Sequence, residues 1–227
     1  MAHLGKEDRL AVIAAAFGCD GHVAATIDSH AQYLTHGAQT TILLKGDDSE
    51  HACLLLAGRA QAVSYSVSGQ MILLFTYGPG DLFGESAALG GAVGAVAGNE
   101  VVATAASEVG HFTNTIFIGL IERYGAVALA VSRLLTRRLG QTTRRMIEAS
   151  TLSTVGRIHT ELLRQARQQP DLTIRPIPVM SEFALLVQST RETVSRAINQ
   201  LEKRGIIRRE AGGLTLVAPH RLEDEII

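Results

Sequence analysis

The stretch STRETVSRAINQLEKRGII, residues 189–207, decides how the C-terminal part of this chain is interpreted. Four apolar residues recur there at the i, i+3, i+4 and i+7 spacing of one helix face: Val194, Ala197, Ile198 and Leu201. This spacing predicts an amphipathic helix over 190–204. The opposite face carries short or forked hydrogen-bonding side chains: Arg191, Glu192, Ser195, Arg196 and Asn199. A helix that only supports a core does not need these polar side chains on its outer face. The neighbouring segments of the sequence indicate what they are for.

The segments on either side predict a winged helix–turn–helix. A shorter helix is expected near 181–187, with three apolar residues facing inward: Phe183, Leu186 and Val187. Many helix–turn–helix turns place glycine at the position of Gln188 to reach a positive φ, so this turn is expected to be strained or differently shaped. After the longer helix, two short β runs meet at Gly212-Gly213, which is typical of a tight hairpin.

The longer helix has two possible N-cap residues. If Ser189 is the N-cap, Glu192 completes an S-x-x-E capping box and folds back over the helix start. If Thr190 is the N-cap, the helix begins one residue later. The choice matters because a Glu192 that serves as a cap is less free to contact other molecules.

The exposed half of the longer helix carries groups that match the edges of DNA bases. An α-helix fits the major groove, where arginine binds guanine and a carboxylate accepts from cytosine. Arg191, Glu192 and Arg196 supply these groups. Nearby hydroxyl and basic groups are suited to further DNA contacts: Ser181, Thr190, Thr193, Ser195, Lys203, Arg208 and Arg209. The alternative is a solvated helix whose charges form surface ion pairs.

The charge distribution favours the DNA-binding interpretation. Residues 151–227 hold 11 basic and 9 acidic residues, a net charge of +2, whereas residues 1–150 have a net charge of −3. A basic C-terminal module suits a polyanion such as double-stranded DNA.

Composition excludes several other classes of protein. Apolar residues make up 46% and charged residues 19%, which is ordinary for a globular chain. No apolar run reaches the about 18 residues that span a bilayer, and no secretory signal is recognisable, so we expect a cytoplasmic protein without a membrane partner. Cys19 and Cys53 are too few for a four-thiolate metal site, and the eight histidines lack metal-like spacing, so no metal is expected.

Two glycine-containing motifs come close to catalytic signatures without matching them. FGESAAL lacks the second glycine of a nucleophile elbow, and GGAVGAVAG lacks the G-K-[ST] of a phosphate-binding loop. No catalytic residue and no enzyme activity are therefore expected.

The N-terminal half predicts a short helix followed by a β-domain. Leu10, Ile13 and Ala14 share one face of a helix expected over 4–17. From about 22 to 115, short apolar runs are separated by glycine-containing turn signals, which is typical of an antiparallel barrel or sandwich.

A long helix is expected to follow the β-domain. It carries a narrow stripe with steps of 3, 4 and 7 residues: Ala128, Val131, Leu135 and Thr142. Such a stripe is typical of a coiled-coil seam, so we expect it to form a homodimer interface. The alternative is a helix packed on its own β-domain. Arg138 lies at or beside the stripe, and the pattern does not give the direction of its side chain.

Two segments together resemble the cAMP receptor protein/FNR (Crp/Fnr) family of bacterial transcription regulators. R-E-T-V-x-R at 191–196 resembles the family's recognition helix, and GDDSEHACLLLAGRAQAVSYSVSGQMILLFTYGPGDLFGE at 46–85 resembles its cyclic-nucleotide-binding fold. The resemblance covers about residues 20–220 and implies an α+β chain. Its expected parts are a β-roll or jelly-roll effector domain at 1–120, a dimerisation helix at 121–150 and a winged helix–turn–helix at 151–227.

The resemblance also implies a function. We expect a homodimer that binds a palindromic DNA site with TGTGA-like half-sites, reads bases with Arg191, Glu192 and Arg196, and contacts RNA polymerase. A sensor module whose main role is ligand binding rather than DNA binding is the alternative.

The effector pocket departs from the family pattern. The resemblance implies a pocket lined by Gly84, Glu85 and Ser86, with Thr142 and Thr143 at the end that contacts the base. The family's phosphate-binding arginine is missing, because no arginine occurs between Arg59 and Arg123. Losing a charge-assisted hydrogen bond removes about 1.5–3 kcal/mol. Weak binding of a cyclic nucleotide, a different effector and no effector all remain open.

Haem is not expected in this pocket, because no Cys-x-His occurs and His111 stands alone.

Overall fold

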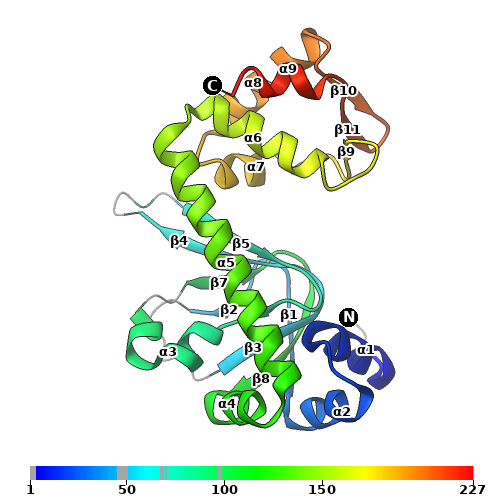
Figure 1. Cartoon of the computed structure of the whole chain (residues 1–227), viewed down its shortest axis with the longest axis vertical. Coiled ribbons are helices and arrows are strands. Elements are labelled where there is room, and N and C mark those ends of the chain that lie inside the picture. Colours follow the sequence, from blue (N-terminus) through cyan, green and yellow to red (C-terminus); the bar gives the residue numbers. More distant parts are fainter. Residues whose placement is uncertain (1–3, 45–50, 67–68, 70, 97–98, 227) are drawn as a thin grey trace. The chain divides into compact units, whose positions relative to one another are not determined.

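The structure is a computed structural model that describes residues 4–44, 51–66, 69, 71–96 and 99–226 (Figure 1). Contacts divide the chain into two compact units, Met1–Arg138 and Leu139–Ile227, and each unit is described by itself. The long helix α5 (Gly125–Thr151) begins in the first unit and ends in the second. The expected division at residues 120 and 150 remains a prediction.

The first unit begins with two helices, α1 (Lys6–Phe17) and α2 (Gly21–His30). The helix predicted over 4–17 is confirmed, with Ile13 fully buried. The prediction of β-structure from residue 22 is wrong over α2, because the Asp20 side chain caps that helix by accepting from the Val23 N–H at 2.9 Å. A third helix, α3 (Glu85–Val96), also interrupts the predicted β region.

Two four-stranded antiparallel sheets form the β-domain, with strand orders β1-β8-β3-β6 and β2-β7-β4-β5. The strands are β1 (Gln32–His36), β2 (Thr41–Leu43), β3 (His51–Ala57), β4 (Ala60–Tyr65), β5 (Met71–Tyr77), β6 (Leu82–Phe83), β7 (Glu100–Ala103) and β8 (Ser107–Thr113). The expected jelly-roll-like domain is confirmed.

Strand β3 is buried on both faces, which explains its nearly continuous apolar sequence. Cys53 and Leu55 pack with residues of the second sheet, such as Val101. The alternate residues Leu54 and Leu56 pack against a layer of helices made by α1, α2, α4 (Asn114–Arg123) and the first part of α5. Figure 1 shows these helices beside β3 and β8.

Val131 of α5 belongs to this core. Its side chain is only 5% exposed because it packs with α1 and β3 residues of its own unit. This packing supports the alternative of a helix packed on its own β-domain at this residue, and a contribution of Val131 to a dimer interface stays a prediction.

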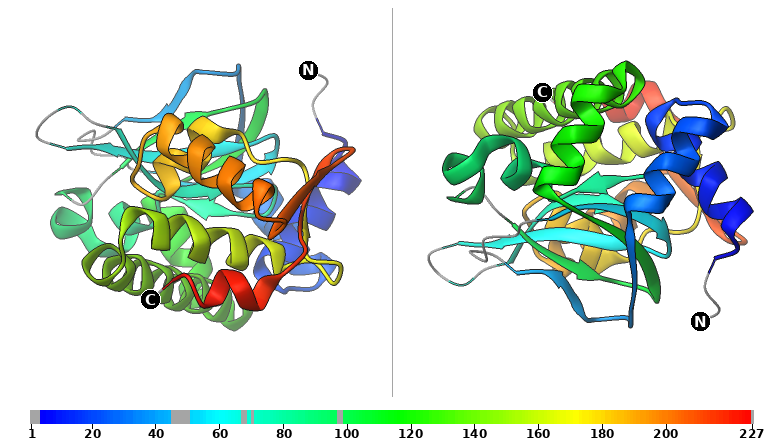
Figure 2. Two further views of the ribbon diagram at one scale, coloured as in Figure 1. Left: turned by 90° about the horizontal axis from the view of Figure 1, so that it is seen from above. Right: turned by 90° about the horizontal axis from the view of Figure 1, so that it is seen from below.

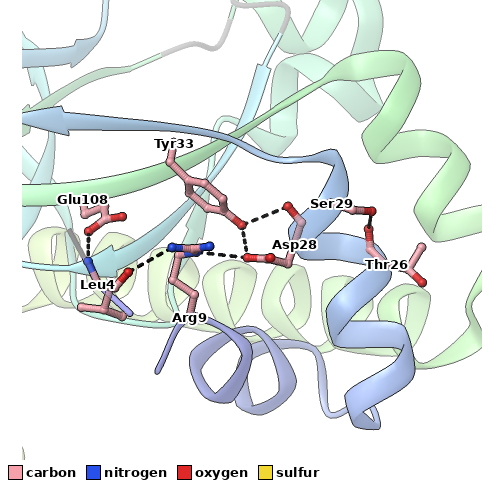
Figure 3. A network of polar contacts seen from close by, with 7 residues as sticks. All are labelled: Leu4, Arg9, Thr26, Asp28, Ser29, Tyr33 and Glu108. Atoms are coloured by element: carbon pink, nitrogen blue, oxygen red, sulfur yellow. Dashed lines mark hydrogen bonds and ion pairs between the residues drawn. The ribbon is translucent and has the colours of Figure 1, made fainter. Parts of the chain in front are cut away.

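A polar network fastens the two N-terminal helices to the sheet (Figure 3). The Arg9 guanidinium bonds Asp28 Oδ1 at 3.1 Å and lies 4.5 Å from the centre of the Tyr33 ring. The Tyr33 hydroxyl donates to the same Asp28 oxygen at 2.6 Å. The Leu4 N–H donates to Glu108 Oε2 on β8 at 2.7 Å. This network ties residue 4, α1, α2, β1 and β8 together.

The second unit contains the end of α5 and the predicted winged helix–turn–helix. Its further helices are α6 (Thr154–Ala166), α7 (Met180–Leu186), α8 (Arg191–Lys203) and α9 (Pro219–Glu223). A three-stranded sheet of order β10-β11-β9 is formed by β9 (Thr173–Ile174), β10 (Ile207–Glu210) and β11 (Gly213–Leu216). The predicted hairpin is β10–β11, beside the end of α8 (Figure 2, left view).

The predicted inward face of α8 forms the centre of this unit. All four of its apolar residues are buried: Val194, Ala197, Ile198 and Leu201. They pack against Phe183 and Val187 from the shorter helix and its end, and against Leu162 of α6. The opposite face of α8 is thereby turned away from the core.

Within the described residues, no single helix is both long and apolar enough to cross a membrane. Two sharply bent helix pairs, α1 with α2 and α4 with α5, satisfy the length and composition criteria together.

Candidate nucleic-acid interface and effector site

Thr190, rather than Ser189, caps the start of α8. The Thr193 N–H donates to Thr190 Oγ1 at 3.2 Å, and the helix begins at Arg191. Glu192 still turns toward the helix start. Hydrogen bonds from its own backbone N–H and from Thr190, together with the Arg191 charge, lower the pKa of the Glu192 carboxyl. Glu192 is therefore charged at neutral pH and is already engaged near the helix start.

Two arginines lie on the exposed face of α8. Arg191 and Arg196 are exposed, and neither forms a hydrogen bond or ion pair with any residue that the structure describes. Guanidinium groups usually find a partner when an acid is within reach, so two unpaired ones on one helix suit a ligand from outside. The remaining predicted DNA-contact residues lie close in sequence: Ser181 is exposed on α7, and Thr193 and Ser195 are partly exposed on α8.

The predicted phosphate-binding arginines of the hairpin have acidic or polar partners. Arg208 bonds Glu210 at 2.7 Å, and Arg209 bonds Asn199 at 2.8 Å. Arg209 also lies 3.5 Å from Glu202. Exposed pairs of this kind contribute about 0–1 kcal/mol, so a phosphate group can replace the acid at little cost.

The turn before α8 has a positive φ at Gln188, a conformation that residues other than glycine seldom adopt. Gln188 adopts φ = +52°, in the left-handed region where many helix–turn–helix turns place glycine. A residue with a Cβ pays roughly 1–2 kcal/mol for this conformation. The expected strain in the turn is therefore present in its backbone.

In the first unit, Glu85 and Arg138 form the centre of the candidate effector site. Glu85 starts α3 and is 2% exposed. Arg138 forms an ion pair with Glu85 Oε1 and donates to the Leu82 carbonyl. Its guanidinium also lies 5.3 Å from the ring centres of both Phe75 and Tyr77.

The sequence pattern did not predict the direction of the Arg138 side chain. It points into the β-domain, so a cation is present there although the expected phosphate-binding arginine is missing. The other oxygen of the same carboxylate, Glu85 Oε2, is buried and has no hydrogen-bond partner among the described residues. Among the described residues, one buried acceptor of the site therefore lacks a hydrogen-bond donor.

Gly84 and Ser86 flank this carboxylate. Gly84 has φ = +77°, and a Cβ at this position would lie 2.6 Å from the His51 carbonyl oxygen, so only glycine fits. Ser86 is exposed and lies 3.4 Å from Glu85 Oε1. Thr142 and Thr143 are exposed on the part of α5 that belongs to the second unit, so their participation in the pocket remains a prediction.

His111 does not stand alone, contrary to the sequence-based expectation. Its Nδ1 lies 3.3 Å from Cys53 Sγ, and its ring centre lies 5.9 Å from that of His36 and 6.1 Å from that of His51. Burial, followed by the two neighbouring imidazoles, lowers the pKa of His111 to about 4. Burial raises the pKa of the Cys53 thiol. Both groups are therefore uncharged at neutral pH.

These residues were missed because they come from three strands that are distant in sequence, β1, β3 and β8. Among the residues the structure describes, no group of three or more His, Cys, Asp or Glu side chains is arranged to hold a metal ion.

Two family models match this sequence. A cyclic nucleotide-binding domain matches residues 34–124, and a Crp-like helix-turn-helix domain matches residues 156–225. The first match contains the Glu85 site and the second contains the whole of α8.

Known proteins similar to the chain over most of its length include a transcriptional regulator and a cyclic AMP receptor protein. The chain is 25% identical over 194 residues to the cAMP-activated global transcriptional regulator CRP of Haemophilus influenzae, covering 83% of this chain and 84% of that protein. It is 29% identical over 185 residues to the cyclic AMP receptor protein of Thermus thermophilus, covering 81% and 82%.

Solved structures have the same fold. A CooA mutant from Carboxydothermus hydrogenoformans superimposes with a TM-score of 0.78 at 16% identity, covering 89% of this chain and 90% of that one. The Thermus thermophilus catabolite activator protein is 26% identical, with a TM-score of 0.52 and coverage of 92% and 96%.

Proposed function

This chain belongs to the cAMP receptor protein/FNR (Crp/Fnr) family of DNA-binding transcription regulators, and we propose that it acts as a homodimer that reads a palindromic DNA site with α8. The observation that carries this proposal is a pair of exposed arginines on α8, Arg191 and Arg196, which have no hydrogen-bond or ion-pair partner among the described residues and lie opposite a buried apolar face. A helix held in this way can enter the major groove without losing its own packing. Ser181, Thr190, Thr193 and Ser195 would add contacts, chiefly to phosphates.

We propose that α5 supplies the dimer contact. A step of seven residues leads from Ala128 to Leu135, and steps of four, three and four then lead to Leu139, Thr142 and Met146. Leu135 is 39% exposed, Leu139 70% and Met146 64%, which is unusual for large apolar side chains spaced along one helix. A second copy of the same helix would cover them. Leu139 and Met146 thus join the predicted residues Ala128, Val131, Leu135 and Thr142, of which Val131 is buried within its own unit.

We propose that the Glu85 site binds a cyclic nucleotide only weakly. The unsatisfied Glu85 Oε2 supports a ligand that donates a hydroxyl hydrogen bond, as a ribose does. Arg138 is already paired with Glu85 and is not free for a phosphate. A ligand that needs a cation for its phosphate would have to compete with that ion pair, which favours weak binding or a less charged effector.

Because this family consists of transcription regulators, we also propose RNA polymerase as a partner. Double-stranded DNA is the partner that a direct experiment can test first.

The test is selection of duplexes from a random library by the purified full-length chain, followed by binding to the selected and a scrambled duplex. Both titrations use one fixed salt concentration, because basic modules hold any duplex at low ionic strength. We expect at least about a thousand-fold preference for the selected duplex, as specific DNA-binding proteins show. Failure to enrich any sequence would overturn the proposed function.

A further inference from the structure

One arginine of the second unit connects two segments that are far apart in sequence. Arg157, in the first turn of α6, donates from Nε to the Val187 carbonyl at 3.0 Å and from Nη2 to the Gln188 carbonyl at 3.3 Å. Both carbonyls belong to the turn between α7 and α8. The guanidinium is therefore attached to the segment that sets where α8 begins.

The same guanidinium also contacts the joint between α5 and α6. Its Nη1 donates to the Leu152 carbonyl at 3.1 Å, and Nη2 lies 3.4 Å from Thr154 Oγ1. Leu152 is the residue between the end of α5 and Ser153, which caps α6 by accepting from the Gly156 N–H at 3.1 Å. One rigid, planar group thus bridges the α5–α6 joint and the α7–α8 turn.

The turn needs such a support because its backbone is unfavourable by itself. Gln188 has φ = +52°, and its neighbour Val187 ends α7. The last carbonyl groups of a helix have no N–H donor within the helix, so they accept hydrogen bonds from donors outside it. Charge-assisted hydrogen bonds from a guanidinium satisfy two of them at once.

Lysine cannot replace this arrangement. The fork of the guanidinium reaches three carbonyl oxygens in different directions, whereas an ammonium group is a compact point charge on a flexible stem. Substitution by lysine therefore keeps the positive charge and removes the bridge between the carbonyl groups. The lysine variant thus separates the effect of the charge from the effect of the hydrogen bonds.

We propose that Arg157 is a positioning residue that fixes the start of α8 relative to the α5–α6 joint by binding the turn and the joint at the same time. The inference rests on the proposed function, because it concerns how the reading helix is held. Arg157 itself does not contact bases in this account. Its guanidinium is engaged with protein carbonyls rather than free like those of Arg191 and Arg196.

The test compares Arg157→Lys with the wild-type chain on the selected and scrambled duplexes at one salt concentration. We expect Arg157→Lys to bind the selected duplex at least ten-fold more weakly and the scrambled duplex with unchanged affinity, since the charge is kept. Thermal unfolding followed by circular dichroism establishes that the variant is folded. Arg157→Met, which lacks both charge and fork, is expected to lose at least as much affinity for the selected duplex.

The double variant Arg157→Lys/Gln188→Gly tests whether Arg157 acts by supporting the turn at Gln188. Glycine adopts a positive φ without strain, so the turn should need the bridge less and about three-fold or more of the lost affinity should return. If Arg157→Met does not fold, the lysine and double variants still decide the question.

Three results would overturn the inference: full discrimination by Arg157→Lys, an equal loss on both duplexes, or no recovery in the double variant. A wild-type chain without sequence preference would instead contradict the proposed function, and with it this inference, before any variant is measured.

Discussion

Arg138 of α5 forms an ion pair with Glu85, a buried carboxylate at the start of α3. This pair attaches α5 to the β-domain, and the same helix continues into the second unit. A ligand that binds Glu85 would share the carboxylate with Arg138. Ligand binding and the attachment of α5 are therefore expected to influence each other.

The first prediction concerns the stability of the Glu85–Arg138 pair. The two side chains are 3% and 14% exposed, so removing one partner leaves a buried charge without compensation. We expect Arg138→Met to lower the free energy of unfolding of the first unit by about 3 kcal/mol. Urea unfolding of the full chain measures this. The double variant Glu85→Gln/Arg138→Met should recover much of the lost free energy of unfolding. If the double variant is as unstable as Arg138→Met, the ion pair does not contribute to stability as proposed.

The second prediction concerns cyclic nucleotide affinity. Because Arg138 is engaged by Glu85 and the family's phosphate-binding arginine is missing, calorimetric titration with cAMP should show weak binding. We expect a Kd roughly ten- to a hundred-fold higher than that of a relative with that arginine measured in parallel, from the loss of one charge-assisted contact. Equal affinity would mean that another group binds the phosphate.

The third prediction concerns the dimer. Leu139→Asp or Met146→Asp places a charge among exposed apolar residues of α5 and should convert the chain to a monomer in sedimentation experiments. Leu89→Asp is the matched control, since Leu89 is a large apolar residue that is 42% exposed on a different helix, α3. An unchanged dimer in both α5 variants, or a wild-type monomer, would refute the proposed interface.

The fourth prediction concerns acid stability. The pKa of His111 is lowered to about 4, so the folded state binds this proton less readily than the unfolded chain does. The stability due to neutral His111 is complete above the unfolded pKa of about 6.5 and is lost as pH falls toward 4. We expect the wild-type chain to lose about 2 kcal/mol more between pH 7 and pH 4.5 than His111→Asn.

Denaturant unfolding at several pH values measures that difference. Burial also lowers the pKa of neighbouring His36, so His36→Asn should act in the same direction. Parallel pH profiles for the wild-type chain and His111→Asn would show that His111 is not responsible.

The elements that the sequence predicted best are those whose signals are local. Helix α8 shows its period, its cap region and its hairpin within a short stretch, so its buried and exposed faces were both assigned correctly. In contrast, α3 was missed because ESAALGGAVGAV is rich in glycine, a poor helix former, and tertiary context overrides that preference.

The residues that could not be assigned depend on contacts between distant segments. The direction of Arg138 is decided by Glu85, 53 residues away, and a helix period cannot reveal it. The Cys53–His111 contact follows from the register of β3 with β8, in which these two residues are directly opposite. Val131 fitted a coiled-coil spacing equally well, but packing against α1 and β3 decided its position.

The most direct test of the account is the DNA-binding preference of Arg191→Ala and Arg196→Ala at fixed salt. Each variant should lose about 1–3 kcal/mol of preference for the selected over the scrambled duplex, with unchanged thermal unfolding. Arg221→Ala is the charge-matched control, since Arg221 is exposed on α9 and should retain the preference. Folded Arg191→Ala and Arg196→Ala variants that both discriminate as well as the wild-type chain would contradict the assignment of α8 as the reading helix.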